Sequence, residues 1–126
     1  MAVFKVEGGH RLHGTITPQG AKNEALQILC AVLLTSERVV VHNVPAILDV
    51  LQLIDLLRKM GVEVEQLSEE SYAFTAREIN FDYLQSDDYR KRAMKLRGSV
   101  MLIGPLLARY GVGYIPKPGG DKIGRR

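Results

Sequence analysis

Apolar residues recur along the chain with two spacings, and the change from one to the other falls near residue 22. Residues 4–7 alternate apolar and polar side chains, and residues 12–16 are predicted to form a second short strand. From Lys22 onward the apolar residues follow a helical period, which predicts a helix with one apolar face. The residues of that face are Ala25, Leu26, Leu29 and Leu33.

Strand and helix patterns continue to alternate further along the chain. We predict a β-branched strand over residues 39–41, a helix over 49–60 that ends at Gly61, and a hairpin formed by 62–65 and 72–74. Residues 85–89 are polar and are predicted to form a loop. A third helix is predicted over residues 91–110, with a kink or local break at Pro105, followed by a strand near 112–115. This alternation favours an α/β layer structure.

A faint internal repeat relates two parts of the chain. Leu33 and Leu34 correspond to Leu106 and Leu107 at an offset of 73 residues, and Pro45 corresponds to residue 118 at the same offset. In both copies a helix ends in paired leucines, a short turn follows, and a strand leads to proline. A repeated unit of this size implies several copies that share a core. Because one complete copy and the start of a second are present, we expect the chain to be part of a larger protein.

Composition narrows the class of protein. With 126 residues and 46% hydrophobic content, the chain is long enough for one domain with a modest core. No apolar run reaches the roughly 18 residues of a membrane span, and the first residues lack the layout of a signal peptide. Cys30 is the one cysteine and cannot form an internal disulfide, which favours a reducing, cytoplasmic location. It lies among apolar residues and is predicted to be inert core. The formal net charge of +3 indicates anionic partners only weakly.

The junction between the second predicted strand and the first helix carries candidate chemistry. Residues 20–23 read Gly-Ala-Lys-Asn, and the free N–H groups of a helix start favour an anion. Lys22 adds a full positive charge, which is otherwise unfavourable in a first turn, so an anionic ligand would offset it. The alternative is a solvated lysine. Asn23 is expected either to orient a ligand hydroxyl or to cap the helix.

A second group of basic residues lies at 90–97. On a helix these side chains spread around most of the circumference, and Tyr89 is the one aromatic residue nearby, so the group is typical of a solvated helix start rather than a nucleic-acid face. Arg97 stands apart, because small and apolar residues follow it up to Arg109 and a lone arginine there is expected to have a specific partner. The three histidines lack the spacing of metal ligands, so no metal site is predicted.

Residues 118–126, Pro-Gly-Gly-Asp-Lys-Ile-Gly-Arg-Arg, are too rich in glycine for a regular helix. Glycines allow backbone N–H groups to approach an anion closely, and lysine and arginine neutralise phosphate or carboxylate groups. Asp121 is the one residue of this segment able to move a proton. The segment therefore suits a small, highly charged substrate.

Together these motifs resemble the family of bacterial UDP-N-acetylglucosamine enolpyruvyl transferases. The matching positions are 20–23, 43–45 with 49–50, 57 with 60–61, 97 leading to 104–106, and 118–120 with 123–124 and 126. The resemblance implies an inside-out α/β barrel of two domains, each with three repeated βαβαββ units, of which this chain is roughly the N-terminal third. Residues 1–21 would be strands that pair with the other domain. Residues 22–126 would be an incomplete catalytic-loop domain, with one βαβαββ unit and the start of a second.

The resemblance also implies a reaction. The enolpyruvyl group of phosphoenolpyruvate is transferred to the 3′-hydroxyl of UDP-N-acetylglucosamine and phosphate is released, the first committed step of peptidoglycan synthesis and hence of cell-wall biogenesis, cell shape and division. Lys22 and Asn23 would contact phosphoenolpyruvate, and Arg97 and Arg126 would hold the UDP-sugar and phosphoenolpyruvate. No metal or organic cofactor, nucleic acid or membrane partner is implied. The general base would lie in the remainder of the polypeptide, so we expect the chain alone to be inactive.

Asp121 departs from the commoner pattern of the family. Most members carry a cysteine there, which serves as general acid, while some carry aspartate. A carboxylic acid can deliver the same proton if it stays protonated. Lys122, Arg125 and Arg126 favour the carboxylate, whereas bound phosphoenolpyruvate would neutralise these cations and repel a second negative charge. We therefore hypothesise that Asp121 becomes a competent acid only in the substrate complex.

Two alternatives remain at this point. The shikimate-pathway relative, EPSP synthase, shares the fold and the enolpyruvyl chemistry, but it would need a Ser-Lys-Ser type motif where this chain has Ala21-Lys22-Asn23. The alternative from another class is a non-catalytic module that binds a phosphate ligand or a nucleic acid. Saturable binding of a UDP-sugar that is lost in Arg97→Ala would separate the enzyme from a nucleic-acid module.

Overall fold

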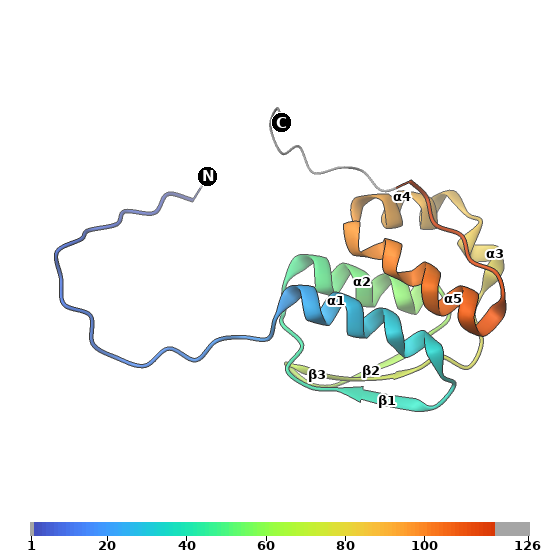
Figure 1. Cartoon of the computed structure of the whole chain (residues 1–126), viewed down its shortest axis with the longest axis horizontal. Coiled ribbons are helices and arrows are strands. Elements are labelled where there is room, and N and C mark those ends of the chain that lie inside the picture. The colour runs from blue at the N-terminus through green and yellow to red at the C-terminus, as the bar shows by residue number, and fades with distance from the viewer. Residues whose placement is uncertain (1, 118–126) are drawn as a thin grey trace.

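A small antiparallel sheet forms one side of the folded body (Figure 1). The structure is a computed structural model that describes residues 2–117. The sheet consists of β1 (Arg38–Val41), β2 (Glu63–Ser68) and β3 (Ser71–Thr75), in the order β1-β3-β2. The central strand β3 pairs with both neighbours, so that Phe74 lies opposite Val39 on one side and Val64 on the other.

Helices cover one face of this sheet in two layers (Figure 1). The layer next to the sheet contains α1 (Lys22–Ala31), its 3-10 extension η1 (Val32–Leu34) and α2 (Leu48–Lys59). The outer layer contains α3 (Phe81–Leu84), α4 (Asp87–Lys95), the 3-10 helix η2 (Arg97–Leu102) and α5 (Ile103–Tyr110). The inner helices bury apolar side chains on both sides, and the fully buried residues include Leu29, Leu33, Leu53, Leu57 and Phe74.

The predicted helix from Lys22, the strand over 39–41, the helix over 49–60 and the hairpin are confirmed. The hairpin turn is tighter than the pattern suggested, because β2 extends to Ser68 and β3 begins at Ser71. The mixed layers of helix and strand agree with an α/β fold. The complete barrel, and its division into domains, remain predictions.

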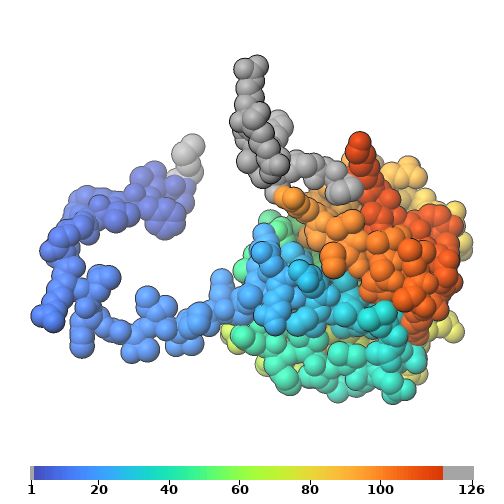
Figure 2. All heavy atoms as spheres, viewed as in Figure 1, coloured from blue at the N-terminus to red at the C-terminus, as the bar shows by residue number. Residues whose placement is uncertain are grey.

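The two N-terminal strands predicted within residues 4–16 are wrong for this chain, since residues 2–21 contain no strand. This segment leaves the folded body as a separate arm (Figure 2). Its five large apolar side chains are 87–93% exposed, and they are Val3, Phe4, Val6, Leu12 and Ile16. A strand requires a neighbour for its N–H and C=O groups, and among the described residues the arm has none. The strand predicted at 112–115 is absent as well.

The region between residues 85 and 110 also differs from its prediction. Residues 85–89 are not a loop, because Ser86 caps α4 by accepting a hydrogen bond from the backbone N–H of Tyr89 (3.1 Å), and the helix begins at Asp87. The break predicted at Pro105 is wrong, because the helix is interrupted at Leu96, whose backbone is extended (φ −105°, ψ 100°). Pro105 instead lies in the first turn of α5, where its missing N–H costs no helical hydrogen bond.

The burial of the paired leucines supports the internal repeat. Leu33 and Leu106 are both fully buried, whereas Leu34 and Leu107 are 53% and 50% exposed. The two copies are also joined directly, since Arg109 Nη1 donates to the carbonyl oxygens of Leu33 (3.1 Å) and Thr35 (3.0 Å). Equivalent positions therefore face one shared core.

Candidate functional site

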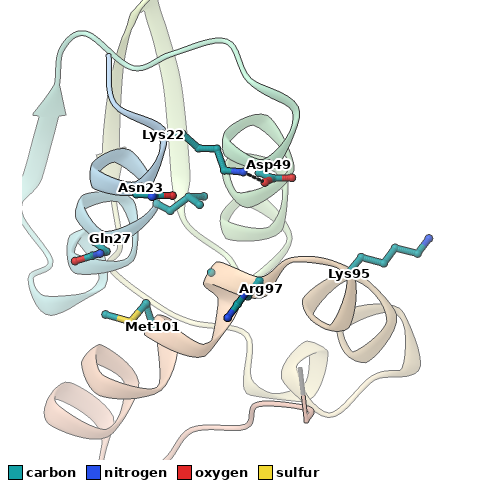
Figure 3. Close-up of a pocket in the computed structure, with 9 residues that line it drawn as sticks. Lys22, Asn23, Gln27, Asp49, Lys95, Arg97 and Met101 are labelled. Carbon is teal, nitrogen blue, oxygen red and sulfur yellow. Dashed lines mark ion pairs between the residues drawn. The ribbon is translucent and has the colours of Figure 1, made fainter. Parts of the chain in front are cut away.

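A cavity of about 500 Å³ lies where the start of α1, the start of α2 and the junction of α4 with η2 meet (Figure 3). It brings together residues that are far apart in the sequence, among them Lys22, Asp49 and Arg97. The lining residues are Lys22, Asn23, Leu26, Gln27, Asp49, Lys95, Arg97, Gly98 and Met101. Three cations, one carboxylate and two side-chain amides thus surround a space large enough for a small anionic molecule.

A close backbone approach fixes the position of α1. A Cβ atom at Gly20 would lie 2.0 Å from the carbonyl oxygen of Asn43, so only glycine permits this approach. Asn43 itself has a positive φ of 57°, and the next residue, Val44, donates its N–H to the carbonyl of Glu70 (2.8 Å). The chain after β1 is therefore held against the residue that precedes the Ala-Lys-Asn sequence, which determines where Lys22 and Asn23 begin α1.

Lys22 forms an ion pair with Asp49, and the Nζ and Oδ2 atoms are 2.6 Å apart. Lys22 lies in the first turn of α1, which has no side-chain cap, so its charge adds to the positive end of that helix. Asp49 lies in the first turn of α2, where a carboxylate is favourable. In the free chain this carboxylate provides the negative charge that the sequence led us to expect from a ligand.

The break at Leu96 places Arg97 beside α1. Ser99 is buried, and its hydroxyl donates to the carbonyl of Ala93 (2.7 Å), which stabilises the turn from α4 into η2. Gly98 lies close to Leu26, since a Cβ at Gly98 would be 3.4 Å from the Leu26 side chain. This contact holds η2 against α1 and sets Arg97 at the cavity.

The outer layer is fastened to α2 by a polar network next to the cavity. Arg92 Nη1 lies 2.8 Å from Asp55 Oδ2, and Arg92 Nε lies 2.9 Å from Asp88 Oδ2. Tyr83 Oη donates to the same Asp88 carboxylate (2.8 Å). The hydrogen bonds from Tyr83 and then Arg92 hold the pKa of Asp88 below its usual range. The network limits how far α4, and with it Lys95, can move; the Lys95 side chain extends away from the Lys22–Asp49 pair (Figure 3).

Three of the predicted site residues, Lys22, Asn23 and Arg97, line this one cavity. The other two, Asp121 and Arg126, lie outside the described residues. Asp49 was not among the predicted site residues, although it belongs to the matched motif positions 49–50. Its acidic side chain at the start of a predicted helix was the available signal, but no local pattern connects it with Lys22.

Within residues 2–117 we also examined possible metal ligands, membrane-spanning helices and the cysteine. No set of three or more His, Cys, Asp or Glu side chains there could hold a metal ion. None of the helices described is long and apolar enough to cross a membrane. Burial raises the pKa of the Cys30 thiol to about 12, so this cysteine is neutral, in agreement with the predicted inert core residue.

The layered arrangement of helix and strand and the basic cavity formed where helices begin define an α/β protein with a candidate binding site. The family model for EPSP synthase (3-phosphoshikimate 1-carboxyvinyltransferase) matches residues 6–126, and the chain belongs to this family. It is 60% identical over 126 residues to the UDP-N-acetylglucosamine 1-carboxyvinyltransferases of Bacteroides fragilis and Bacteroides thetaiotaomicron, and 55% identical to that of Porphyromonas gingivalis.

These matches cover the whole chain but only 29% of the length of each of those relatives. The predicted resemblance to UDP-N-acetylglucosamine enolpyruvyl transferases is thereby confirmed. The family description also includes the alternative that the sequence left open, the EPSP synthases. All three of these relatives carry the name of the UDP-sugar enzyme.

Proposed function

We propose that this chain forms part of the substrate site of a UDP-N-acetylglucosamine 1-carboxyvinyltransferase. The observation that carries the proposal is the meeting of Lys22, Asn23 and Arg97 at one cavity. These three residues are separated in the sequence, and the resemblance had assigned each of them to substrate binding. A cavity lined by cations and side-chain amides suits a reaction in which the protein orients two charged substrates.

Each side chain has a distinct part in binding. Lys22 would neutralise a charged group of phosphoenolpyruvate, and Asn23 offers both an amide donor and a carbonyl acceptor beside it. Arg97 offers a planar set of N–H donors, which suits the oxygens of the UDP diphosphate. Gln27 adds a further side-chain amide to the same wall. The cavity therefore supports binding of both substrates side by side.

The reaction proposed here is an addition followed by an elimination. The oxygen of the sugar 3′-hydroxyl bonds to C2 of phosphoenolpyruvate while Asp121 gives a proton to C3, and a base from outside this chain takes the hydroxyl proton. In the resulting tetrahedral intermediate, C3 then loses a proton and the bond from C2 to the phosphate oxygen breaks. Phosphate leaves, and the enolpyruvyl group remains on the sugar. Arg126 would help to hold the substrates as the intermediate forms.

The remainder of the polypeptide would complete the fold. The exposed apolar residues of the N-terminal arm support pairing of residues 2–21 with strands of a second domain, since they have no other cover among the described residues. The repeat supports the inside-out barrel of βαβαββ units. The proposal places the reaction in the cytoplasm and in peptidoglycan synthesis, with no cofactor.

A chimera tests this function. Residues 1–126 would replace the matching 126 residues of the Bacteroides fragilis relative, and phosphate release would be measured with phosphoenolpyruvate and UDP-N-acetylglucosamine. We expect turnover by the chimera, none by the isolated chain, and a loss of UDP-sugar binding in Arg97→Ala but not in Arg90→Ala, whose guanidinium pairs only with Asp87 among the interactions described.

Three results would reject the proposal. One is a folded chimera that lacks turnover while the unaltered relative is active. Another is release of phosphate by the chimera with shikimate 3-phosphate instead of the UDP-sugar, which would favour an EPSP synthase. The third is nucleic-acid binding by the isolated chain that depends on Arg97 and is not displaced by UDP-N-acetylglucosamine, which would favour a binding module.

A further inference from the structure

The candidate cavity lies between the two helical layers of the fold. One wall comes from the inner layer, with Lys22 and Asn23 on α1 and Asp49 on α2. The other wall comes from the outer layer, with Lys95 at the end of α4 and Arg97 at the start of η2. Figure 3 shows Lys22 and Asp49 on one side of the opening and Arg97 on the other. The distance between the two walls therefore depends on how the outer helices are held against α1 and α2.

Arg92 joins the two layers through a forked pair of contacts. Its Nη1 atom lies 2.8 Å from Oδ2 of Asp55 on α2, and its Nε atom lies 2.9 Å from Oδ2 of Asp88 on its own helix. Tyr83 Oη donates to the same Asp88 carboxylate at 2.8 Å, so Asp88 is itself held in place. The contact with Asp88 orients the guanidinium group, and the contact with Asp55 ties α4 to α2 in that orientation.

The connection continues from Arg92 to the wall that carries Arg97. Ala93 follows Arg92 in the sequence, and its carbonyl accepts a hydrogen bond from the buried Ser99 hydroxyl (2.7 Å). This bond spans the break at Leu96 and fixes the position of η2 relative to α4. A shift of α4 along α2 would therefore move Arg97 as well.

Apolar packing holds α4 less firmly than it holds the inner helices. Tyr89 and Ala93 are the buried residues of α4, whereas α2 buries five side chains. Ala93 offers a single methyl group, and the hydroxyl of Tyr89 donates to the carbonyl of Tyr114 (2.7 Å), which lies beyond α5 and not on α2. Little apolar contact is thus available within α4 to keep it in place once the ion pair with Asp55 is lost.

We propose that Arg92 is a positioning residue of the substrate site, which holds Arg97 at its distance from Lys22 by tying α4 to Asp55. Arg92 is not among the residues that line the cavity, so it acts through the place of Arg97. The inference rests on the proposed function, in which Arg97 binds the UDP-sugar. Arg92 and Asp55 are 42% and 47% exposed, so water screens their attraction, and the expected effect is a few-fold change in affinity and not a complete loss.

The key variant is Asp55→Asn in the chimera, because charge and position predict opposite results for it. This substitution removes a negative charge near the site, so electrostatics alone would tighten the binding of the anionic UDP-sugar. Loss of the ion pair with Arg92 would instead weaken that binding, because Arg97 is then less well placed. We expect the dissociation constant of UDP-N-acetylglucosamine, measured by titration calorimetry, to rise about two- to fivefold, as the loss of one partly exposed ion pair implies. The value of kcat at saturating substrates should stay within about twofold, because the lost interaction serves binding before and during the reaction alike.

Arg92→Lys is the second variant, since it keeps the positive charge and loses the fork. It should weaken binding of the UDP-sugar by a similar factor. The matched controls are Asp87→Asn and Arg90→Lys, which make the same chemical changes on α4 but affect an ion pair within that helix (3.2 Å). Neither control should weaken the binding. Amide hydrogen exchange in residues 87–95 should be faster in Asp55→Asn and Arg92→Lys than in the controls, because α4 is then held less firmly.

The results separate this inference from the proposed function. Unchanged or tighter binding of the UDP-sugar in Asp55→Asn would overturn the positioning role, and so would equal weakening by Asp55→Asn and Asp87→Asn. If the unaltered chimera is active and the Asp55 and Arg92 variants match it in affinity and in hydrogen exchange, the proposed function stands and the inference fails. An unaltered chimera that neither binds the UDP-sugar nor releases phosphate would reject both. Urea midpoints close to that of the unaltered chimera would show that the variants fold.

Discussion

Replacing Gly20 by alanine tests how tightly the start of α1 is held. The new Cβ would lie 2.0 Å from the carbonyl oxygen of Asn43, 3.1 Å from its carbonyl carbon and 3.2 Å from Pro45 Cδ. Two of these three contacts are with backbone atoms, which cannot rotate away. The turn is also held from its other side, since Val44 donates its N–H to Glu70 (2.8 Å). The backbone must therefore move by about 1 Å to restore ordinary contact distances.

The cost follows from two opposing effects. Overpacking against a fixed neighbour destabilises by about 1–3 kcal/mol, and the loss of glycine's freedom in the unfolded chain returns about 0.4–1 kcal/mol. We expect a net fall of about 1–2 kcal/mol in the free energy of unfolding for Gly20→Ala. The same shift moves Lys22 relative to Asp49, so binding of inorganic phosphate should weaken as well.

Urea denaturation followed by far-ultraviolet circular dichroism measures the stability change. The control is Gly104→Ala in α5, where a Cβ would meet nothing within 4 Å. That variant should gain about 0.5 kcal/mol, because alanine is the better helix former. Equal or increased stability of Gly20→Ala would refute the close approach as the feature that positions α1, and so would equal changes in the two variants.

Three further predictions concern other parts of the molecule. Arg109→Met removes three hydrogen bonds to backbone carbonyls and should lower the free energy of unfolding, measured by urea denaturation, by about 2 kcal/mol. The control is Arg90→Met, which loses one surface ion pair and should change the free energy of unfolding by less than about 0.5 kcal/mol. Burial raises the pKa of Cys30 and of Tyr89 to about 12, from ordinary values of 9.0 and 10.0, and the unfolded chain loses both protons first. The contribution of these two groups to the free energy of unfolding should therefore be fully present below about pH 9 and be lost as the pH rises toward 12, by at most about 1.4 kcal/mol per pH unit for each group. The dependence on pH should be less steep in Cys30→Ala. Asp121→Asn in the chimera should abolish phosphate release while phosphoenolpyruvate still binds.

Each of these expectations has a result that contradicts it. Equal destabilisation by the two arginine substitutions would mean that the link between η1 and α5 carries no special weight. A free energy of unfolding that stays constant up to pH 11 would show that the buried thiol and phenol do not resist ionisation. Normal turnover of the Asp121→Asn chimera would exclude this carboxyl group as the acid.

Local patterns were sufficient for the parts of the fold that local interactions determine. The helical period around Leu29 and Leu33 predicted α1, and the helix stop at Gly61 and the hairpin after it follow the same kind of signal. The residues of the N-terminal arm have an equally clear strand pattern, yet they form no strand. Pairing of strands is non-local, so the pattern of the arm could not show whether a partner is at hand.

At the candidate site, too, the sequence predicted what depends on local interactions and not what depends on how helices pack. The sequence identified Lys22 as a cation at an unfavourable helix start and inferred an anionic ligand beside it, which stays a prediction, whereas the anion that the structure shows beside Lys22 is a carboxylate of the same chain. It could not identify that anion as Asp49, because the pairing depends on how α1 and α2 pack side by side. Similarly, the sequence marked Pro105 as the place of a break, whereas the break falls at Leu96, where the buried Ser99 hydroxyl bonds back to α4.

The position of Cys30 makes the opening of α1 measurable in the unaltered chain. It is the single cysteine of the sequence, and it is 1% exposed, on the helix that begins with Lys22. A thiol-specific reagent can reach it only when α1 separates from the core, so the rate of labelling reports that separation without any added probe. A ligand that binds the closed arrangement of α1, α2 and η2 should slow the labelling in proportion to its occupancy. One buried sulfur atom thus gives a kinetic readout of binding at a cavity that it does not touch.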